Sequence, residues 1–209
     1  MQIVFFFFLL MVTSIDPTTL SPNSTVVLNP GIGQDEICSK EIYEWSLTLK
    51  HELQKKFPQL HIVLSRGMYE KINQKQIASA CNHINPDLFI SLHISKNFQT
   101  TISIYSYLQN PTTDYWNTEK NSLTLIPTDK SHSSYTKVSR HLTETLTSLL
   151  KKQYPHAAWY GIPFRPLHGI HAPAFAIELS VTRPNEWRSY TPSLIKNLSS
   201  LIEPESLTL

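Results

Sequence analysis

Residues 87–93, which read DLFISLH, decide the fold class of this chain. Four of these seven residues are large and apolar, and Ser91 is the one polar residue between them. A nearly continuous apolar run of this length is typical of a central parallel strand that helices cover on both faces. The stretch therefore predicts a strand in the middle of an α/β domain.

Strand-like and helix-like segments alternate on both sides of this stretch. Strands are predicted at residues 25–28, 61–65, 101–108 and 174–179, and helices at residues 39–57, 77–84, 134–152 and from Thr191-Pro192 onward. Residues 101–108 alternate polar and apolar side chains, as expected nearer a sheet edge. The order of these segments predicts an α/β fold. We expect a single domain with a twisted, mostly parallel mixed sheet flanked by helices on both faces.

Length and charge limit the classes of function. A chain of 209 residues and 24.0 kDa has room for one domain with a sizeable core. Its net charge is +2 and its basic residues are scattered, so no nucleic-acid partner is expected. The sequence does not indicate an oligomeric state.

The N-terminal residues read as an export signal. Residues 3–12 are an apolar run of ten residues, whereas a membrane-spanning helix needs about 20. We expect a signal peptide at 1–14, a linker at 15–23, the domain at 24–203 and a tail at 204–209, in an exported, periplasmic or extracellular protein. An uncleaved N-terminal anchor and a misjudged start codon are the alternatives, and no other membrane contact is expected.

The two cysteines, Cys38 and Cys81, are too few and too far apart in sequence for a cysteine-built zinc site. In an exported protein they could form a disulfide if their Cα atoms approach within about 7 Å. Two small buried side chains are the alternative interpretation.

Three apolar runs end at positions where the fold could present a side chain to a ligand: Ile32 after a Pro-Gly turn, His93, and Glu178 within AFAIEL. Open α/β sheets bind ligands at the carboxyl ends of their strands. A buried carboxylate needs a partner or a raised pKa, so Glu178 is a candidate acid/base. His93 is a candidate metal ligand, although a lone histidine in a buried strand is more often a hydrogen-bonded core residue.

The order of five motifs resembles that of the zinc-dependent N-acetylmuramoyl-L-alanine amidases. The motifs are residues 26–33 (VVLNPGIG), Lys40-Glu41, residues 63–66 (VLSR), residues 87–93 (DLFISLH) and residues 173–179 (PAFAIEL). Residues 159–167 and 184–186 also look like the family's segments around its last core strand. The resemblance implies an exported hydrolase of cell-wall peptidoglycan.

The resemblance also implies site residues. His93 matches a zinc-binding histidine, Glu178 matches the catalytic glutamate, and Glu41, with Glu44 as a competitor, matches the zinc-binding glutamate. The remaining zinc-binding histidine is replaced by Ile32, which cannot bind a metal. Substitute ligands could come from Cys38, His171 or His168, and Arg66 and Arg165 are candidate substrate-binding residues. These further candidates complete the predicted site.

Ile32 determines which function is expected. A catalytic zinc needs three protein ligands and a water, whose pKa it lowers to about 7. We therefore expect an amidase-family protein with impaired catalysis. The alternatives are an active zinc amidase with a substitute ligand, and a non-catalytic peptidoglycan-binding or regulatory module whose groove Trp116, Trp159 and Trp187 could line.

Overall fold

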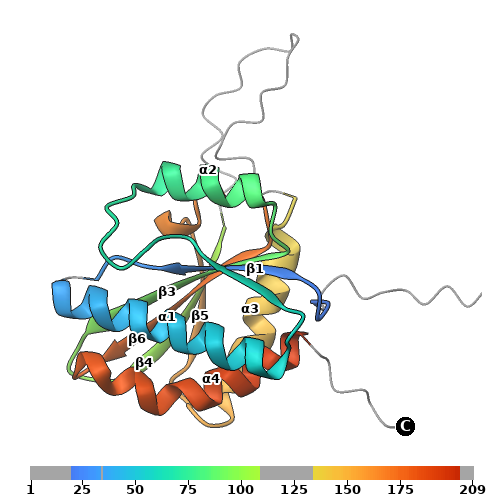
Figure 1. Ribbon diagram of the computed structural model, residues 1–209. Helices are drawn as coiled ribbons and strands as arrows, with labels where there is room; N and C mark the ends of the chain where they lie inside the picture. Colours follow the sequence, from blue (N-terminus) through green and yellow to red (C-terminus); the bar gives the residue numbers. More distant parts are fainter. Residues whose placement is uncertain (1–19, 34, 109–133, 203–209) are drawn as a thin grey trace, which may run out of the picture.

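A computed structural model describes residues 20–33, 35–108 and 134–202 (Figure 1). Six strands form one sheet: β1 Thr25–Pro30, β2 His61–Leu64, β3 Leu88–Lys96, β4 Thr101–Tyr107, β5 Ala158–Ile162 and β6 Ala174–Val181. Their order is β2-β1-β3-β6-β4-β5. Strands β2, β1, β3 and β6 run parallel to one another, and β4 is antiparallel to β6 and parallel to β5. The predicted mostly parallel mixed sheet is confirmed.

Helices cover both faces of the sheet, as the sequence predicts. They are α1 Glu36–Lys56, α2 Gln74–Ile84, α3 Thr136–Lys151 and α4 Trp187–Ile202, with the short 3-10 helices η2 Arg165–Leu167 and η3 Pro184–Glu186. In Figure 1, α2 lies on one side of the sheet, and α1 and α4 lie on the other. None of the helices in the described part of the chain combines the length and apolar character needed to cross a membrane.

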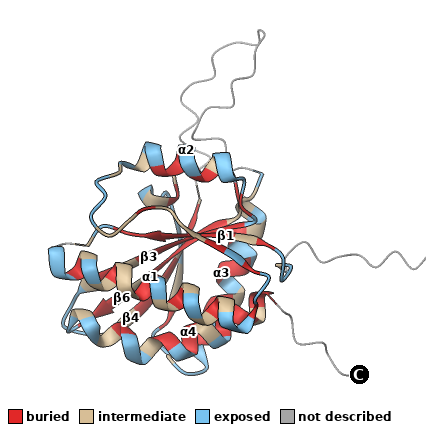
Figure 2. Cartoon of the chain, in the orientation of Figure 1, coloured by how far each residue is buried: buried red, intermediate tan, exposed pale blue. Residues whose placement is uncertain are grey.

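The central strand β3 contributes to two cores because its side chains alternate between the faces. Ile90 and Leu92 join the larger core, which α1, α3 and α4 cover, whereas Phe89 joins the smaller core under α2. Figure 2 shows buried residues on the strands and on the helix faces turned toward them. Burial on both faces explains why residues 87–93 are apolar almost without interruption.

Two boundaries differ from the prediction. The sequence places Thr191 and Pro192 at the start of the last helix, but α4 begins at Trp187 and contains Pro192. The buried Trp187 side chain anchors the earlier start, at the cost of the backbone hydrogen bond that a proline cannot donate. In addition, β5 forms the sheet edge beside β4, within an aromatic and proline-rich passage for which the sequence predicts no strand.

The cysteines are separate. Cys38 lies on α1 and Cys81 on α2, on opposite sides of the sheet, and both are free and buried. Of the two interpretations of these residues, the structure shows small buried side chains and no disulfide. The predicted signal peptide, the tail, Trp116 and residues 109–133 lie outside the described residues, as does most of the predicted linker.

Candidate functional site

His93 and Glu178 lie side by side on the face of the sheet that α2 covers. They are direct neighbours in the register between β3 and β6. Each follows the alternation of its own strand, in which Ile177 and Leu179 point into the larger core on the opposite face. The pairing of two parallel strands thus brings together the histidine and the glutamate that the sequence singles out.

A hydrogen-bond chain through the buried residues Asn29 and Ser91 leads to the His93 ring. Ser65 Oγ donates to Asn29 Oδ1 over 2.7 Å, and Asn29 Nδ2 donates to Ser91 Oγ over 2.8 Å. Ser91 Oγ lies 2.8 Å from His93 Nε2. Burial lowers the pKa of His93 to about 4, with the Glu178 carboxylate opposing this shift and Arg66 adding to it. His93 is therefore a neutral imidazole at neutral pH.

Glu178 accepts a hydrogen bond of 2.9 Å from the hydroxyl of Tyr105 on β4. Burial, together with this carboxylate, raises the pKa of Tyr105 to about 12, so the phenol keeps its proton and remains a donor. The Tyr105 ring stacks on Phe164, with 4.4 Å between centroids, and on Tyr160. Phe164 also meets His93 edge to face. An aromatic wall thus borders the His93–Glu178 pair.

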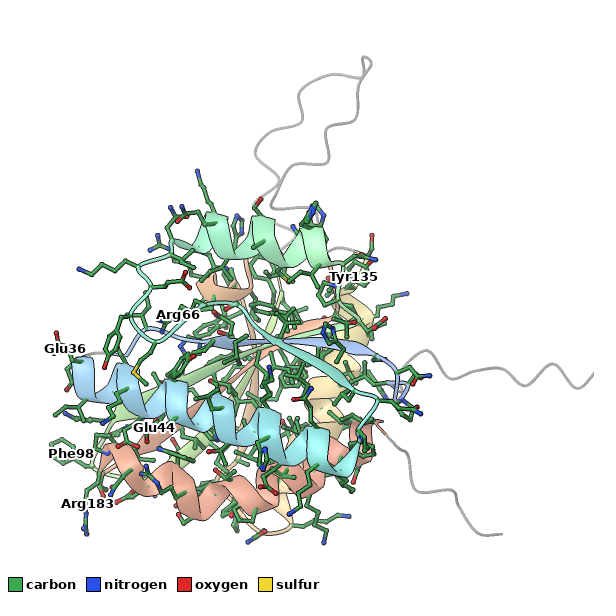
Figure 3. All side chains as sticks on the ribbon, viewed as in Figure 1. Glu36, Glu44, Arg66, Phe98, Tyr135 and Arg183 are labelled. Carbon is green, nitrogen blue, oxygen red and sulfur yellow. The ribbon has the colours of Figure 1, made fainter. Side chains whose placement is uncertain are left out.

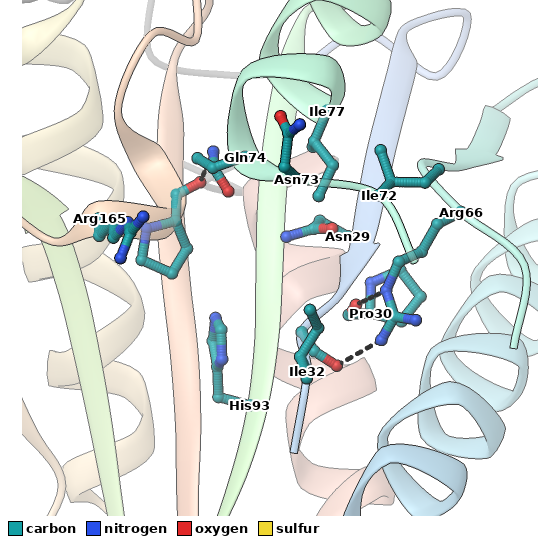
Figure 4. Close-up of a pocket in the computed structure, with 12 residues that line it drawn as sticks. Asn29, Pro30, Ile32, Arg66, Ile72, Asn73, Gln74, Ile77, His93 and Arg165 are labelled. Atoms are coloured by element: carbon teal, nitrogen blue, oxygen red, sulfur yellow. Dashed lines mark hydrogen bonds between the residues drawn. The ribbon is translucent and has the colours of Figure 1, made fainter. Parts of the chain in front are cut away.

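A pocket of about 500 Å³ opens beside His93 (Figure 4). Ile32 lines it and is 67% exposed, so this isoleucine is not a core side chain. Gly31 is required here by close approach, because a Cβ at this position would collide with His93 Nδ1 and the Leu92 carbonyl oxygen. The hydrocarbon side chain of Ile32 therefore lies where the resemblance to amidases places a zinc-binding histidine.

Arg66 supports the turn at the end of β1. Its guanidinium donates from Nε to Pro30 O over 2.6 Å and from Nη2 to Gly31 O over 2.7 Å, as the dashed lines in Figure 4 show. The residue is 6% exposed and lies between α1 and α2 in the view of Figure 3. Arg165, the other predicted substrate-binding residue, is exposed at the pocket edge. Arg165 is thus the more accessible of the two to a ligand.

Glu41 lies at the contact between α1 and α4. Its carboxylate accepts a hydrogen bond of 2.6 Å from the Trp187 indole and pairs with Arg188 at 3.0 Å. Glu44, the competing candidate, pairs with Arg188 as well. The structure therefore does not bring Glu41 together with His93 and Glu178, because its helix position points it toward α4.

The predicted substitute ligands are also dispersed. Cys38 is buried at the start of α1, and burial, with a smaller contribution from Asp35, raises the pKa of its thiol. His168 and His171 line a separate pocket of about 570 Å³ along α2. His168 lies 3.3 Å from the Tyr107 hydroxyl, and the His171 side chain is exposed.

The described residues do not fit the three-ligand zinc site that the resemblance implies. Ile32 has no donor atom, Glu41 is held by α4, and Nε2 of His93 faces the Ser91 hydroxyl. No three His, Cys, Asp or Glu side chains within residues 20–33, 35–108 and 134–202 gather closely enough to hold a metal ion. Catalytic zinc sites use three such ligands.

Sequence reasoning missed Asn29, Ser91 and Tyr105 as site residues. A signal existed for the first two, because each is the one polar residue within a short apolar run, residues 26–30 and 88–92, and a buried polar group needs a partner. Tyr105 offered no comparable signal, since alternating strands commonly carry tyrosine. Of the Trp residues expected to line a groove, the two that the structure describes do not line the pocket beside His93: Trp187 is buried at the start of α4, and Trp159 donates to Ser106.

Solved structures share this fold. An N-acetylmuramoyl-L-alanine amidase from Clostridium difficile 630 superposes with a TM-score of 0.55 at 21% identity, covering 87% of this chain and 98% of that one. The amidase AmiC2 of Nostoc punctiforme gives 0.55 at 14% identity, with 87% and 96% covered. Ami1 from Mycobacterium smegmatis gives 0.54 at 10% identity, with 88% and 98% covered. No curated protein sequence matches the chain.

The structure is an α/β domain in which the paired residues His93 and Glu178 lie on one face of parallel strands, with a pocket beside His93. The sequence model of one family, Amidase_3, described as N-acetylmuramoyl-L-alanine amidase, matches residues 26–193. The chain belongs to this family of peptidoglycan amidases.

Proposed function

We propose that this chain is an exported amidase-family protein that acts on peptidoglycan and whose amide hydrolysis is impaired. One observation carries the proposal: Ile32, at the position that the resemblance assigns to a zinc-binding histidine, is exposed in the pocket beside His93. Export rests on the apolar N-terminal run of the sequence. The His93–Glu178 pair and its pocket remain as the ligand site.

The chemistry explains the expected impairment. Hydrolysis of an amide by this class of enzyme needs a metal-activated water and a carboxylate that accepts its proton. Glu178 could supply the carboxylate, with Tyr105 donating to it and fixing its orientation. The metal, however, would have His93 as its single ligand among the predicted residues that line the pocket. Zinc held by so few ligands would be exchanged rapidly.

Zinc content and hydrolysis test the proposal together. The wild-type chain, Ile32→His and Leu47→His are purified, their zinc is measured by mass spectrometry, and release of peptides from purified sacculi is followed. Leu47 is an exposed apolar residue on α1, so Leu47→His controls for an added surface histidine. We expect little zinc and little peptide release from the wild type and from Leu47→His, and more zinc in Ile32→His, which adds one ligand. Near-stoichiometric zinc with peptide release from the wild type would overturn the proposal.

A second function, peptidoglycan binding without hydrolysis, is favoured by the aromatic wall. Tyr160 is 46% exposed at the sheet edge and stacks on Tyr105, which holds Glu178. Ligand sites commonly combine aromatic side chains with a few placed polar groups. Co-sedimentation with sacculi tests it: Tyr160→Ala should lose binding, whereas Phe98→Ala, at another exposed aromatic residue, should retain it. Equal binding by both variants would refute this role for the wall.

A further inference from the structure

The hydrogen-bond chain from Ser65 to His93 runs in one direction. Asn29 uses its amide oxygen to accept from Ser65 and its amide nitrogen to donate to Ser91. The Ser91 hydroxyl, which is fully buried, therefore receives a hydrogen bond from Asn29 and keeps its own hydrogen for another acceptor. The acceptor within reach is Nε2 of His93, at 2.8 Å.

A neutral imidazole that accepts at Nε2 carries its proton on Nδ1. Nδ1 lies against Gly31, and no hydrogen-bond partner for it is found among the described residues. His93 lines the pocket, and its Nδ1 is not one of the fully enclosed polar atoms that lack a partner. The N–H group at Nδ1 is thus left for a ligand.

We infer that Asn29 is a positioning residue that fixes His93 as the Nδ1–H tautomer, so that the ring offers the pocket a hydrogen-bond donor in place of a metal-binding lone pair. Such a donor takes a hydrogen-bond acceptor, and the amide carbonyl oxygen is an acceptor that peptides and N-acetyl sugars share. This inference rests on the proposed function and names the ligand chemistry of the same site.

The inference gives a reason for weak metal binding that is independent of Ile32. A metal needs a ring nitrogen with a free lone pair. Here Nε2 accepts from Ser91, and Nδ1 carries a proton. An aspartate at position 29 would reverse the chain, because a carboxylate only accepts. Ser91 would then donate to Asp, Nε2–H of His93 would donate to Ser91, and the lone pair would move to Nδ1.

Nitrogen NMR of the histidine ring measures the tautomer directly. The full chain is labelled with 15N-histidine, freed of metal with a chelator and recorded near neutral pH, with the His93 signals assigned by their loss in His93→Gln. We expect a protonated Nδ1 in the wild type and a protonated Nε2 in Asn29→Asp. Asn197→Asp, which adds a carboxylate at another mostly buried asparagine, should leave the wild-type pattern unchanged.

A protonated Nε2 in the wild type would overturn the inference, and so would an unchanged tautomer in folded Asn29→Asp. The wild-type spectrum decides the matter even if Asn29→Asp does not fold. Zinc titration by calorimetry adds a second readout: Asn29→Asp combined with Ile32→His should bind zinc about 10–100-fold more tightly than Ile32→His alone. Equal affinities would contradict the inference. Because the tautomer is read without hydrolysis, an active wild type would refute the proposed function and leave this result intact.

Discussion

Replacing Arg66 with methionine should destabilise the fold by about 2–4 kcal/mol. The guanidinium makes two short hydrogen bonds, to the carbonyl oxygens of Pro30 and Gly31, and two longer ones of 3.4 and 3.5 Å to Gly67 and Glu70. Each carbonyl left without a donor costs about 1–3 kcal/mol when buried. Two such losses give roughly 2–6 kcal/mol, and water entering from the adjacent pocket favours the lower part of this range.

Urea unfolding, followed by circular dichroism, measures this loss. Arg66→Lys should recover about half of it, because an ammonium group does not span two carbonyls as the guanidinium fork does. The matched control is Arg165→Met, at an exposed arginine on the same pocket, with an expected change below about 0.5 kcal/mol. Wild-type stability in Arg66→Met, together with weakened binding to sacculi, would refute the structural role and restore Arg66 as a substrate-binding residue.

Three further predictions concern His93, Glu41 and the cysteines. As the pH falls from 6.5 to about 4, His93 should be protonated in the unfolded chain but remain neutral in the native protein, so the metal-free protein should lose roughly 3 kcal/mol of its free energy of unfolding. Urea unfolding at a series of pH values measures this loss, and His93→Gln should make the dependence on pH weaker. Glu41→Ala should cost about 1–3 kcal/mol by leaving the Trp187 indole without its acceptor, and should not change the zinc affinity of the chain that also carries Asn29→Asp and Ile32→His; a lower affinity would show that Glu41 is a ligand. Since Cys38 and Cys81 are buried and burial raises the pKa of Cys81 to about 12, Ellman's reagent at about pH 8 should find no reactive thiol in the native protein and two after denaturation.

The sheet could be predicted because hydrophobic patterning reports burial directly. Residues 87–93 are apolar on both faces because cores lie on both faces, and the apolar stripe of α1 faces the sheet. The sequence does not predict edge strand β5, because its residues are partly exposed and its partner strand β4 lies far away in the sequence. The early start of α4 escaped prediction because the burial of Trp187 outweighs the local signal of Thr191 and Pro192.

The pairing of His93 with Glu178 follows from topology, since parallel neighbouring strands align residues near their ends. Glu41 shows where such reasoning stops. Its place in the sequence suits a ligand, but the direction of its side chain depends on the rotation of α1, which the Trp187 and Arg188 partners reveal only in three dimensions. Sequence order gives the strand on which a residue lies more readily than the face of a helix that it occupies.

The tautomer of His93 also depends on a contact that the sequence does not show, which is the hydrogen bond that Asn29 donates to Ser91. An asparagine and an aspartate at this position have nearly the same shape, and both would bridge Ser65 and Ser91. They differ in that the amide can donate, and this one donor decides which nitrogen of His93 is protonated. Restoring a histidine at Ile32 would therefore supply one missing ligand while the His93 ring still offers a proton where a metal needs a lone pair. Recovery of zinc binding should therefore need both changes, and the two together should raise zinc affinity by more than the sum of their separate effects.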